Sequence, residues 1–215
     1  MKIITWNLLH RAGANIDEVE RLIVHEQPDL MLMQETTDRI DILPTRIGGH
    51  YARDPLPGRS HGLAAWSPKP FRQPPAALLL QPGVFVRRVC QIIDLGHISF
   101  ANVHLSHGQI LNRRQLRRIS EILPHCAAIL GDCNLVGPPL LRGFQDVGPR
   151  LPTHEAGSIL PLRLDRCFVR GVTCHSATVL GGGQSDHLPI AVQLTLPPGI
   201  PGRTGDPLAA EAQLA

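Results

Sequence analysis

A short apolar run that stops at a polar tetrapeptide places the tightest constraint on how this chain folds. Residues 127–130, Ala-Ala-Ile-Leu, predict a buried strand, and Gly131-Asp132-Cys133-Asn134 follows at once. Residues two apart in an extended segment point to the same side, so Asp132 and Asn134 are expected to face a common pocket. Gly131 gives the backbone room to turn. Asp and Asn after a strand are also ordinary turn residues, so this interpretation needs support from the rest of the chain.

The same combination of an apolar run and a terminal polar side chain recurs along the sequence. Besides Asp132 and Asn134, the polar residues at or beside predicted strand ends are Asn7, Glu35, His104, Asp165, Asp186 and His187. The strand ends of layered sheets form one rim, where loops carry function on a rigid scaffold. These residues therefore predict a shared site.

Short strands dominate the expected fold, with only two or three helices among them. Strands are expected over 2–6, 29–33, 61–66, 76–80, 84–95, 98–105, 127–130, 163–169 and 188–196, and near 144–147 and 172–179. Residues 15–18 resemble a capping box at the start of a helix, and a second helix followed by a loop is expected within 36–60. This pattern favours mainly antiparallel sheets packed on each other with helices outside. One domain is expected over 1–196, followed by a flexible tail rich in Pro, Gly and Ala over 197–215.

A third helix, over 110–123, has an apolar face and an arginine face. Its arginines, Arg113, Arg114, Arg117 and Arg118, suit a phosphate backbone, although such a face is more often simply solvated. The net charge of +3 permits an anionic partner without requiring one.

Composition indicates an intracellular protein. The five cysteines are widely spread and contain no CxxC pair, which argues against a disulfide framework and a thiolate zinc site. The first residues resemble no signal peptide, and no apolar stretch approaches the ~20 residues that span a bilayer. We expect a cytoplasmic protein with no membrane span.

Several of the strand-end residues suit catalysis, although each has an ordinary alternative. Glu35 and Asn7 offer the hard oxygen atoms that Mg²⁺ or Mn²⁺ accepts, but they are equally good cap or turn residues. His187 needs an orienting carboxylate, for which Asp165 is the best candidate. The alternative for Asp165 is a surface ion pair with the flanking Arg163 or Arg166. His104, inside an apolar strand, is otherwise a core histidine.

Taken in order, these segments resemble the endonuclease/exonuclease/phosphatase superfamily of deoxyribonuclease I-like and exonuclease III-like hydrolases. The matching segments are 5–7 (TWN), 34–35 (QE), 61–64 (HGLA), 102–105 (NVHL), 131–134 (GDCN), Thr153, 164–166 (LDR) and 185–189 (SDHLP). The resemblance implies an α/β (α+β) fold, a four-layer αββα sandwich of two mixed, mainly antiparallel sheets with outer helices. It also implies metal-dependent hydrolysis of a phosphoester, with Mg²⁺ or Mn²⁺ as cofactor.

The resemblance also implies roles for individual residues. Glu35 would be the principal metal ligand, with Asn7 beside it and Asp186 close to the metal. Asp132 would orient or deprotonate the attacking water, and Asn134 would help to place it. His187 with Asp165 would bind the phosphate or move a proton, and His104 would contact the phosphate or assist the leaving group. Candidate substrate contacts are His61, Arg113, Arg114 and Thr153.

Substrate and partners are less constrained than the chemistry. A phosphodiesterase or nuclease is the preferred hypothesis, with DNA or RNA as candidate substrates and a monomer as the expected state. The alternatives are a phosphomonoesterase or a hydrolase of lipid or small phosphoesters, and an inert binding module that keeps the fold. Cys133 stands where the family commonly has an aromatic residue. The loops are short and show no insertion suited to wedging into a duplex, which favours a small or exposed phosphoester.

Overall fold

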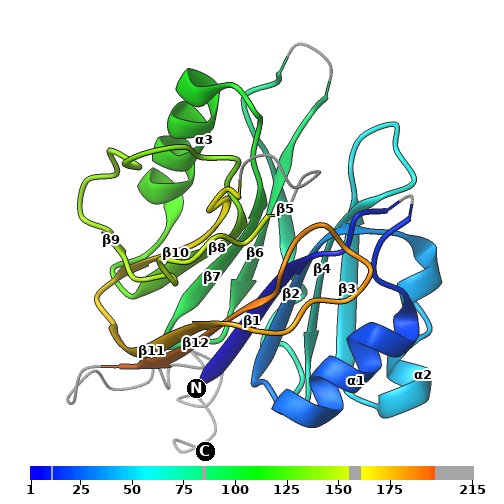
Figure 1. Ribbon diagram of the computed structural model, residues 1–215. Helices are drawn as coiled ribbons and strands as arrows, with labels where there is room; N and C mark the ends of the chain where they lie inside the picture. The colour runs from blue at the N-terminus through cyan, green and yellow to red at the C-terminus, as the bar shows by residue number, and fades with distance from the viewer. Residues whose placement is uncertain (11, 84–85, 155–160, 197–215) are drawn as a thin grey trace, which may run out of the picture.

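Two β-sheets pack face to face, and helices cover their outer sides (Figure 1). The computed structural model describes residues 1–10, 12–83, 86–154 and 161–196; the predicted flexible tail, 197–215, lies outside them. Within the described residues, each sheet has six strands, in the orders β11-β12-β1-β2-β4-β3 and β5-β6-β7-β8-β10-β9. β1 pairs with β2 and β7 with β8 in parallel, whereas the other neighbours are antiparallel.

The first sheet consists of β1 (Lys2–Asn7), β2 (Leu30–Thr36), β3 (His50–Pro55), β4 (Gly62–Ser67), β11 (Thr173–Val179) and β12 (Ile190–Thr195). The second consists of β5 (Ala76–Leu79), β6 (Val89–Asp94), β7 (Ser99–His104), β8 (Ala127–Asp132), β9 (Gln145–Asp146) and β10 (Asp165–Arg170). The helices are α1 (Ile16–Glu26), the short 3-10 helix η1 (Asp38–Ile40), α2 (Leu43–Ile47) and α3 (Gln109–Ile122).

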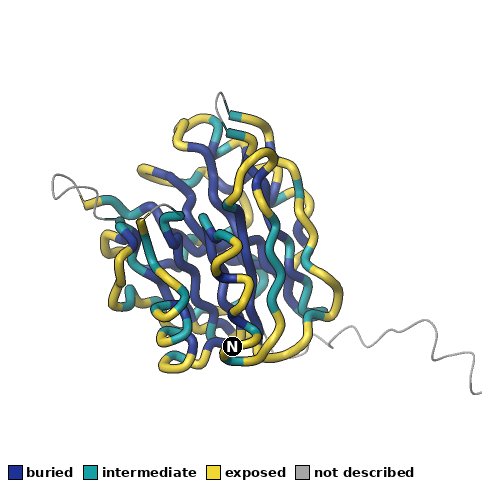
Figure 2. Tube along the Cα trace, turned by 90° about the vertical axis from the view of Figure 1, so that its right-hand side faces the viewer, coloured by how far each residue is buried: buried dark blue, intermediate teal, exposed yellow. Residues whose placement is uncertain are grey.

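Three apolar layers hold the four-layer sandwich together. Side chains alternate between the two faces of a strand, so Ile3 lies in the core between the sheets while Ile4 packs under α1 and α2. On the other side, Leu116 and Ile119 of α3 pack against the outer face of the second sheet. Figure 2 shows the buried residues along the central strands and the exposed ones along the periphery. The predicted αββα sandwich is confirmed.

Two β-α-β units form the centre of the sandwich. In each, a parallel pair of strands is joined through a helix: β1-α1-β2 in the first sheet and β7-α3-β8 in the second. Asn15 caps α1, and Glu18 closes the predicted capping box. Since β1 and β2 contact β8 across the interface, the carboxyl ends of both parallel pairs meet at one end of the molecule.

Several predicted boundaries differ from the structure. Residues 36–60 contain two short helical segments and then β3, a strand that the sequence did not predict because it is a half-exposed edge strand. The strand expected from residue 84 begins only at Val89, and residues 84–85 lie outside the described part. β2 continues past Glu35 through a bulge, and β8 runs on to Asp132. No helix in the described part is long and apolar enough to cross a membrane.

Candidate active site

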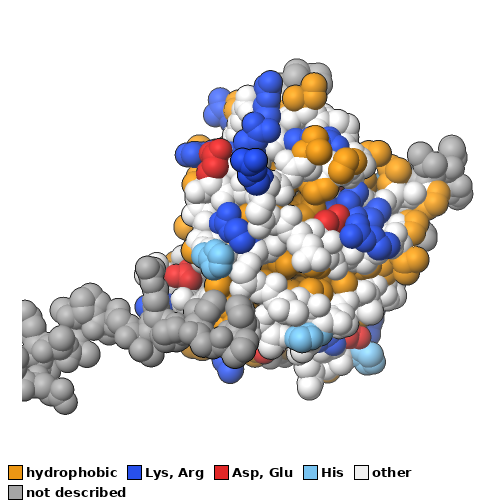
Figure 3. All heavy atoms as spheres, turned by 90° about the vertical axis from the view of Figure 1, so that its left-hand side faces the viewer, with side chains coloured by type: hydrophobic (Ala, Val, Ile, Leu, Met, Phe, Trp, Pro, Cys, Tyr) orange, Lys and Arg blue, Asp and Glu red, His pale blue; other side chains and the backbone are white. Residues whose placement is uncertain are grey.

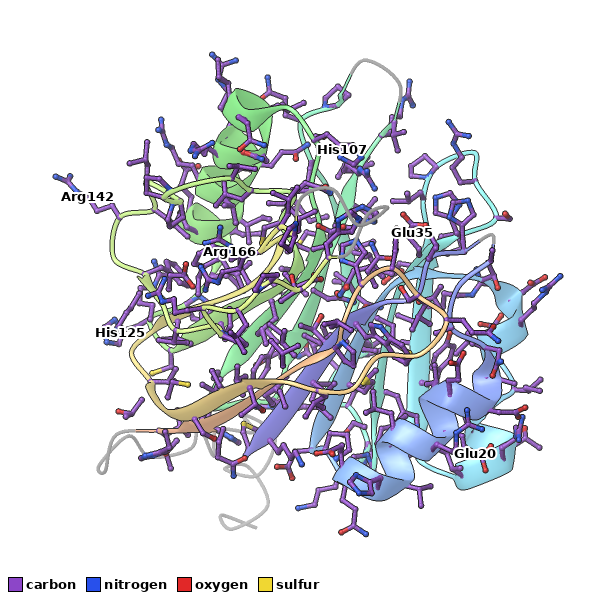
Figure 4. The ribbon with its side chains drawn as sticks, in the orientation of Figure 1. Glu20, Glu35, His107, His125, Arg142 and Arg166 are labelled. Carbon is purple, nitrogen blue, oxygen red and sulfur yellow. The ribbon has the colours of Figure 1, made fainter. Side chains whose placement is uncertain are left out.

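Glu35 owes its position to an irregularity in the first sheet. β2 shifts register against β4 between Gln34 and Thr36, which leaves Glu35 at a bulge with a φ of 55°. Left-handed backbone at a residue other than glycine costs free energy and is concentrated at functional sites. The bulge turns Glu35 into a cleft at the carboxyl ends of β1 and β2, beside Asn7. In Figure 4, Glu35 and His107 are both found toward the upper ends of the two sheets, and both line this cleft.

Three neighbouring strands of the second sheet contribute one residue each to the same cleft. His104 of β7 is in register with Asp132 of β8, and Asp165 of β10 is in register with Asp132 from the other side. The Nε2 atom of His104 lies 3.3 Å from Oδ2 of Asp132. All three side chains are almost fully buried. The pairing register alone therefore brings an imidazole and two carboxylates together.

His187 reaches this group from the loop that precedes β12. Its Nδ1 lies 2.8 Å from Oδ2 of Asp165, and its Nε2 lies 3.7 Å from Oδ2 of Asp132. The loop is held in place because the Ser185 hydroxyl donates to the Asn7 carbonyl (2.6 Å) and Trp6 Nε1 donates to the His187 carbonyl (2.8 Å). Asp165 thus makes the contact with His187 that the predicted orienting role requires, and the alternative ion pair with Arg163 or Arg166 is absent from the described contacts.

Asp132 is the best-connected side chain of the cleft. Its Oδ2 accepts a hydrogen bond from Asn7 Nδ2 (3.0 Å), and its Oδ1 accepts one from the Asn134 backbone N–H (3.0 Å). Burial alone would raise the pKa of Asp132, but His104, His187 and these hydrogen bonds outweigh it and hold the pKa below its ordinary value. Asp132 is therefore an ionised carboxylate at neutral pH.

The two histidines of the cleft differ in charge. Burial lowers the pKa of His104 to about 3, so its ring is neutral at pH 7 despite the neighbouring carboxylates. Burial also opposes the charged form of His187, but contact with Asp165 and the charge of Asp132 outweigh it and raise its pKa to about 9. The cleft therefore holds a neutral imidazole and an imidazolium on either side of one carboxylate.

The cleft has a volume of about 390 Å³. Seven of the predicted site residues line it: Asn7, Glu35, His104, Asp132, Asn134, Asp186 and His187. The lining also includes His107, Val136, His154 and Leu162. The structure thus brings together every predicted catalytic and metal-binding residue, with Asp165 directly behind His187.

The donor set of the cleft fits a hard divalent cation. Oε1 of Glu35 lies 3.8 Å from His104 Nδ1, on the cleft side. The Oδ1 atom of Asn7 accepts one hydrogen bond, from the Leu9 N–H (3.1 Å), and retains a second lone pair. Asp186 has a buried Oδ1 without a hydrogen-bond partner in the described part of the chain. Carboxylate and amide oxygens of this kind suit Mg²⁺ or Mn²⁺.

Three residues of the site were missed by the sequence analysis. Arg88 is only 6% exposed, and burial lowers the pKa of its guanidinium. The negative charges of Asp132 and Glu35 partly oppose this shift. His10 contacts the Glu35 carboxylate. His154 lies 3.4 Å from Asp186 through Nε2 and packs edge-on against the His187 ring. None follows a strand end, so no local pattern marks them.

Two predicted substrate contacts have other roles. The Thr153 hydroxyl accepts the N–H groups of Leu164 and Asp165 (3.1 and 3.0 Å), and the residue is fully buried. It holds the start of β10. The Arg113 guanidinium donates to the carbonyls of Gln109, Val136 and Pro138, and so anchors the loop after β8 to α3. Thr153 is thus enclosed beneath the surface, whereas contact of the half-exposed Arg113 with substrate stays a prediction.

Arg114 and His61 differ from these two. Arg114 is exposed on α3. Figure 3 shows several Lys and Arg side chains on the face that it draws. His61 stacks on His10, with ring centroids 3.8 Å apart. Their contact with substrate stays a prediction.

The αββα sandwich and the carboxylate–imidazole cleft at its strand ends define a metal-dependent phosphoester hydrolase. The chain belongs to the endonuclease/exonuclease/phosphatase family, whose model matches residues 4–187. The resemblance inferred from the sequence is thereby confirmed. Among curated proteins, none matches the sequence.

Several solved structures have the same fold. The endonuclease/exonuclease/phosphatase from Bacteroides vulgatus has a TM-score of 0.73 and 18% identity, over 91% of this chain and 98% of that one. Truncated Caenorhabditis elegans TDP2 has a TM-score of 0.72 and 18% identity, over 90% and 96%. The mannosyl-6-phosphatase of Bacteroides thetaiotaomicron has a TM-score of 0.71 and 15% identity, over 91% and 100%. At these identities the likeness shows the fold alone.

Proposed function

We propose that this protein is a divalent-metal-dependent phosphodiesterase that acts on nucleic acid, with Mg²⁺ or Mn²⁺ held by Glu35, Asn7 and Asp186. One observation carries the proposal: Oδ2 of Asp132 lies 3.3 Å from His104 Nε2 and 3.7 Å from His187 Nε2, in the same cleft as Glu35. In-line hydrolysis of a phosphodiester needs a base, a stabiliser of negative charge and help for the leaving oxygen. The cleft supplies a candidate for each.

When bound, the cation neutralises negative charge on the phosphate oxygens. Asp132 acts as the base, because its depressed pKa keeps it ionised and its two oxygens are fixed by Asn7 and Asn134. Asn134, at a φ of 46°, is held by its Nδ2 donating to the Leu105 carbonyl (3.0 Å). Its side chain helps to place the attacking water beside Asp132.

His187 and His104 act on the phosphate from opposite sides of Asp132. Because Asp165 fixes the proton of His187 Nδ1, Nε2–H is directed at a phosphate oxygen. His104 stays neutral, so its ring can donate a hydrogen bond to the leaving oxygen without adding a second positive charge. Arg88 contributes the permanent positive charge that a phosphate oxygen requires.

A phosphomonoesterase is the second candidate, favoured by what surrounds the cleft. Arg113, one of the basic residues that suited a nucleic-acid backbone, is occupied by loop carbonyls. Val136 and Leu162 add an apolar part to the cleft wall. Both features suit a small phosphoester whose phosphate alone enters the cleft.

The test compares three substrates: an aryl phosphodiester, an aryl phosphomonoester and plasmid DNA, each with Mg²⁺, Mn²⁺ or EDTA. The wild-type protein is measured beside Asp132→Asn, a near-isosteric change that removes the carboxylate. We expect metal-dependent cleavage of the diester and of DNA, lost in the variant. Preference for the monoester would replace the first candidate with the second. Equal rates in both proteins would refute the assignment of the site, and silence on every substrate would favour an inert binding module.

A further inference from the structure

The loop that follows β1 folds back tightly beside Glu35. Leu9 adopts a φ of 54°, and the N–H groups of Gly13 and Ala14 donate to the carbonyls of Leu9 and Leu8 (both 2.8 Å). A Cβ atom at Gly13 would stand 1.8 Å from the Leu8 carbonyl oxygen, so only glycine fits there. This turn directs both the backbone and the ring of His10 toward Glu35.

His10 contacts one oxygen of the Glu35 carboxylate with two nitrogen atoms. Its backbone N–H donates to Oε2 (3.2 Å), and its ring Nδ1 contacts the same Oε2. The other oxygen, Oε1, is the one that lies near His104, on the cleft side. His10 thus holds Oε2 of the carboxylate, whereas Oε1 faces the cleft.

A second imidazole supports the first. The rings of His10 and His61 are stacked, with centroids 3.8 Å apart and planes inclined by 15°. His61 is itself anchored, because its carbonyl accepts the Leu56 N–H (2.9 Å) at the start of β4. The stack fixes the ring plane of His10 and leaves its Nδ1 directed at Glu35.

We propose that His10 is a positioning residue for the metal-binding carboxylate of Glu35, an inference that rests on the proposed function of the cleft. With its proton on Nδ1, the ring and the backbone N–H donate two hydrogen bonds to Oε2. Oε1 is then presented to the cation. Ligating carboxylates are commonly oriented by such hydrogen bonds, and loss of an orienting partner typically costs about 10- to 100-fold in metal affinity.

The molecule contains a matched control for this contact. His25 lies 2.8 Å from Glu26 through Nδ1, which is also an imidazole–carboxylate pair. The His25 side chain is 83% exposed on α1 and lines no part of the cleft. Removing it tests the effect of losing such a pair where no metal is bound.

The experiment measures Mn²⁺ binding by the full chain, without substrate, from the paramagnetic resonance signal of the free ion. The proteins are the wild type, His10→Ala, His10→Asn, Glu35→Gln and His25→Ala. We expect His10→Ala to bind Mn²⁺ about 10- to 100-fold more weakly. His10→Asn, whose amide nitrogen can replace Nδ1, should recover most of the affinity, and His25→Ala should match the wild type. The melting temperature of metal-free His10→Ala should equal that of the wild type.

Three results would overturn the inference. Wild-type affinity in His10→Ala, with affinity lost in Glu35→Gln, would reject His10 alone and leave the proposed function standing. An equally weak His10→Asn would mean that the ring itself ligates the ion. A lowered melting temperature of metal-free His10→Ala would mean a structural role. Equal affinity in Glu35→Gln and the wild type would instead reject the metal site of the proposed function.

Discussion

Two acidic residues of the second sheet, the buried Asp132 and the half-buried Asp146, have contrasting surroundings. Asp146 is bound by Arg163 (2.6 Å) and Arg166 (2.9 Å), two permanently charged side chains that form several hydrogen bonds with it. Asp132 is bound instead by amides and imidazoles. Arginine stays protonated at any ordinary pH, whereas an imidazole can gain or lose a proton. Asp146 is therefore held in a fixed ion pair, whereas Asp132, the proposed base, lies among groups that can exchange protons.

Both regions meet on β10, at two successive residues. Asp165 faces the cleft and pairs with His187, whereas Arg166 points to the other side and pairs with Asp146. Neighbours in a strand point to opposite faces. One short segment thus supplies a partner for His187 in the proposed site and a structural ion pair, and the pleat separates the two.

The largest effect is expected at Glu35, the proposed metal ligand beside Asp132 in the cleft. Glu35→Gln should lower the metal-dependent rate about 1,000-fold, equivalent to about 4 kcal/mol, because a neutral amide binds a divalent cation far less well. Glu20→Gln is the control. Glu20 lies on α1, far from Glu35 in Figure 4, and pairs with Arg46 of α2 (2.7 Å). A rate in Glu35→Gln near that of the control would contradict the assignment.

The charged state of His187 predicts a pH-dependent contribution to stability. Its folded pKa is raised to about 9, against about 6.5 in an unfolded chain. Its contribution is therefore complete below about pH 6.5 and is lost as the pH rises through about 9, by about 3 kcal/mol in all. Urea unfolding of wild type and His187→Gln should show their difference shrinking over this range. A difference independent of pH would show that His187 is not held as an imidazolium.

A smaller effect is expected at Arg88. Arg88→Lys keeps the charge but loses the planar fork that binds two phosphate oxygens at once. We expect kcat/KM to fall about tenfold, mainly through KM, equivalent to about 1.4 kcal/mol. The neighbouring Arg87 is exposed, so Arg87→Lys should leave both constants unchanged. Unchanged constants in both variants would indicate that Arg88 acts through its charge alone instead of through a specific contact.

The sequence predicted those parts of the fold and site that follow from strand patterns. Asp132, His104 and Asp165 each close or open a buried strand, and the strand register brings them together. β3 was missed because it is a half-exposed edge strand with no alternation of apolar residues.

The missed site residues depend on how loops fold over the strands. His10, Arg88 and His154 approach the cleft only after loops have packed, so neither spacing nor periodicity marks them. Thr153 and Arg113 show the converse. Their residue types suit substrate binding, but backbone groups that the sequence does not reveal take up their hydrogen bonds.

Exchanging the same acid for the same amide at the two contrasted positions tests the account most directly. Hydrolysis rates and free energies of unfolding would be measured for Asp132→Asn and Asp146→Asn. We predict that Asp132→Asn loses activity about 100- to 1,000-fold and loses less stability than Asp146→Asn. Asp146→Asn should lose about 3 kcal/mol of stability, because Arg163 and Arg166 are left without their counter-charge, and should keep its rate while folded. The reverse pattern, or equal effects at both positions, would contradict the division into a catalytic and a structural carboxylate.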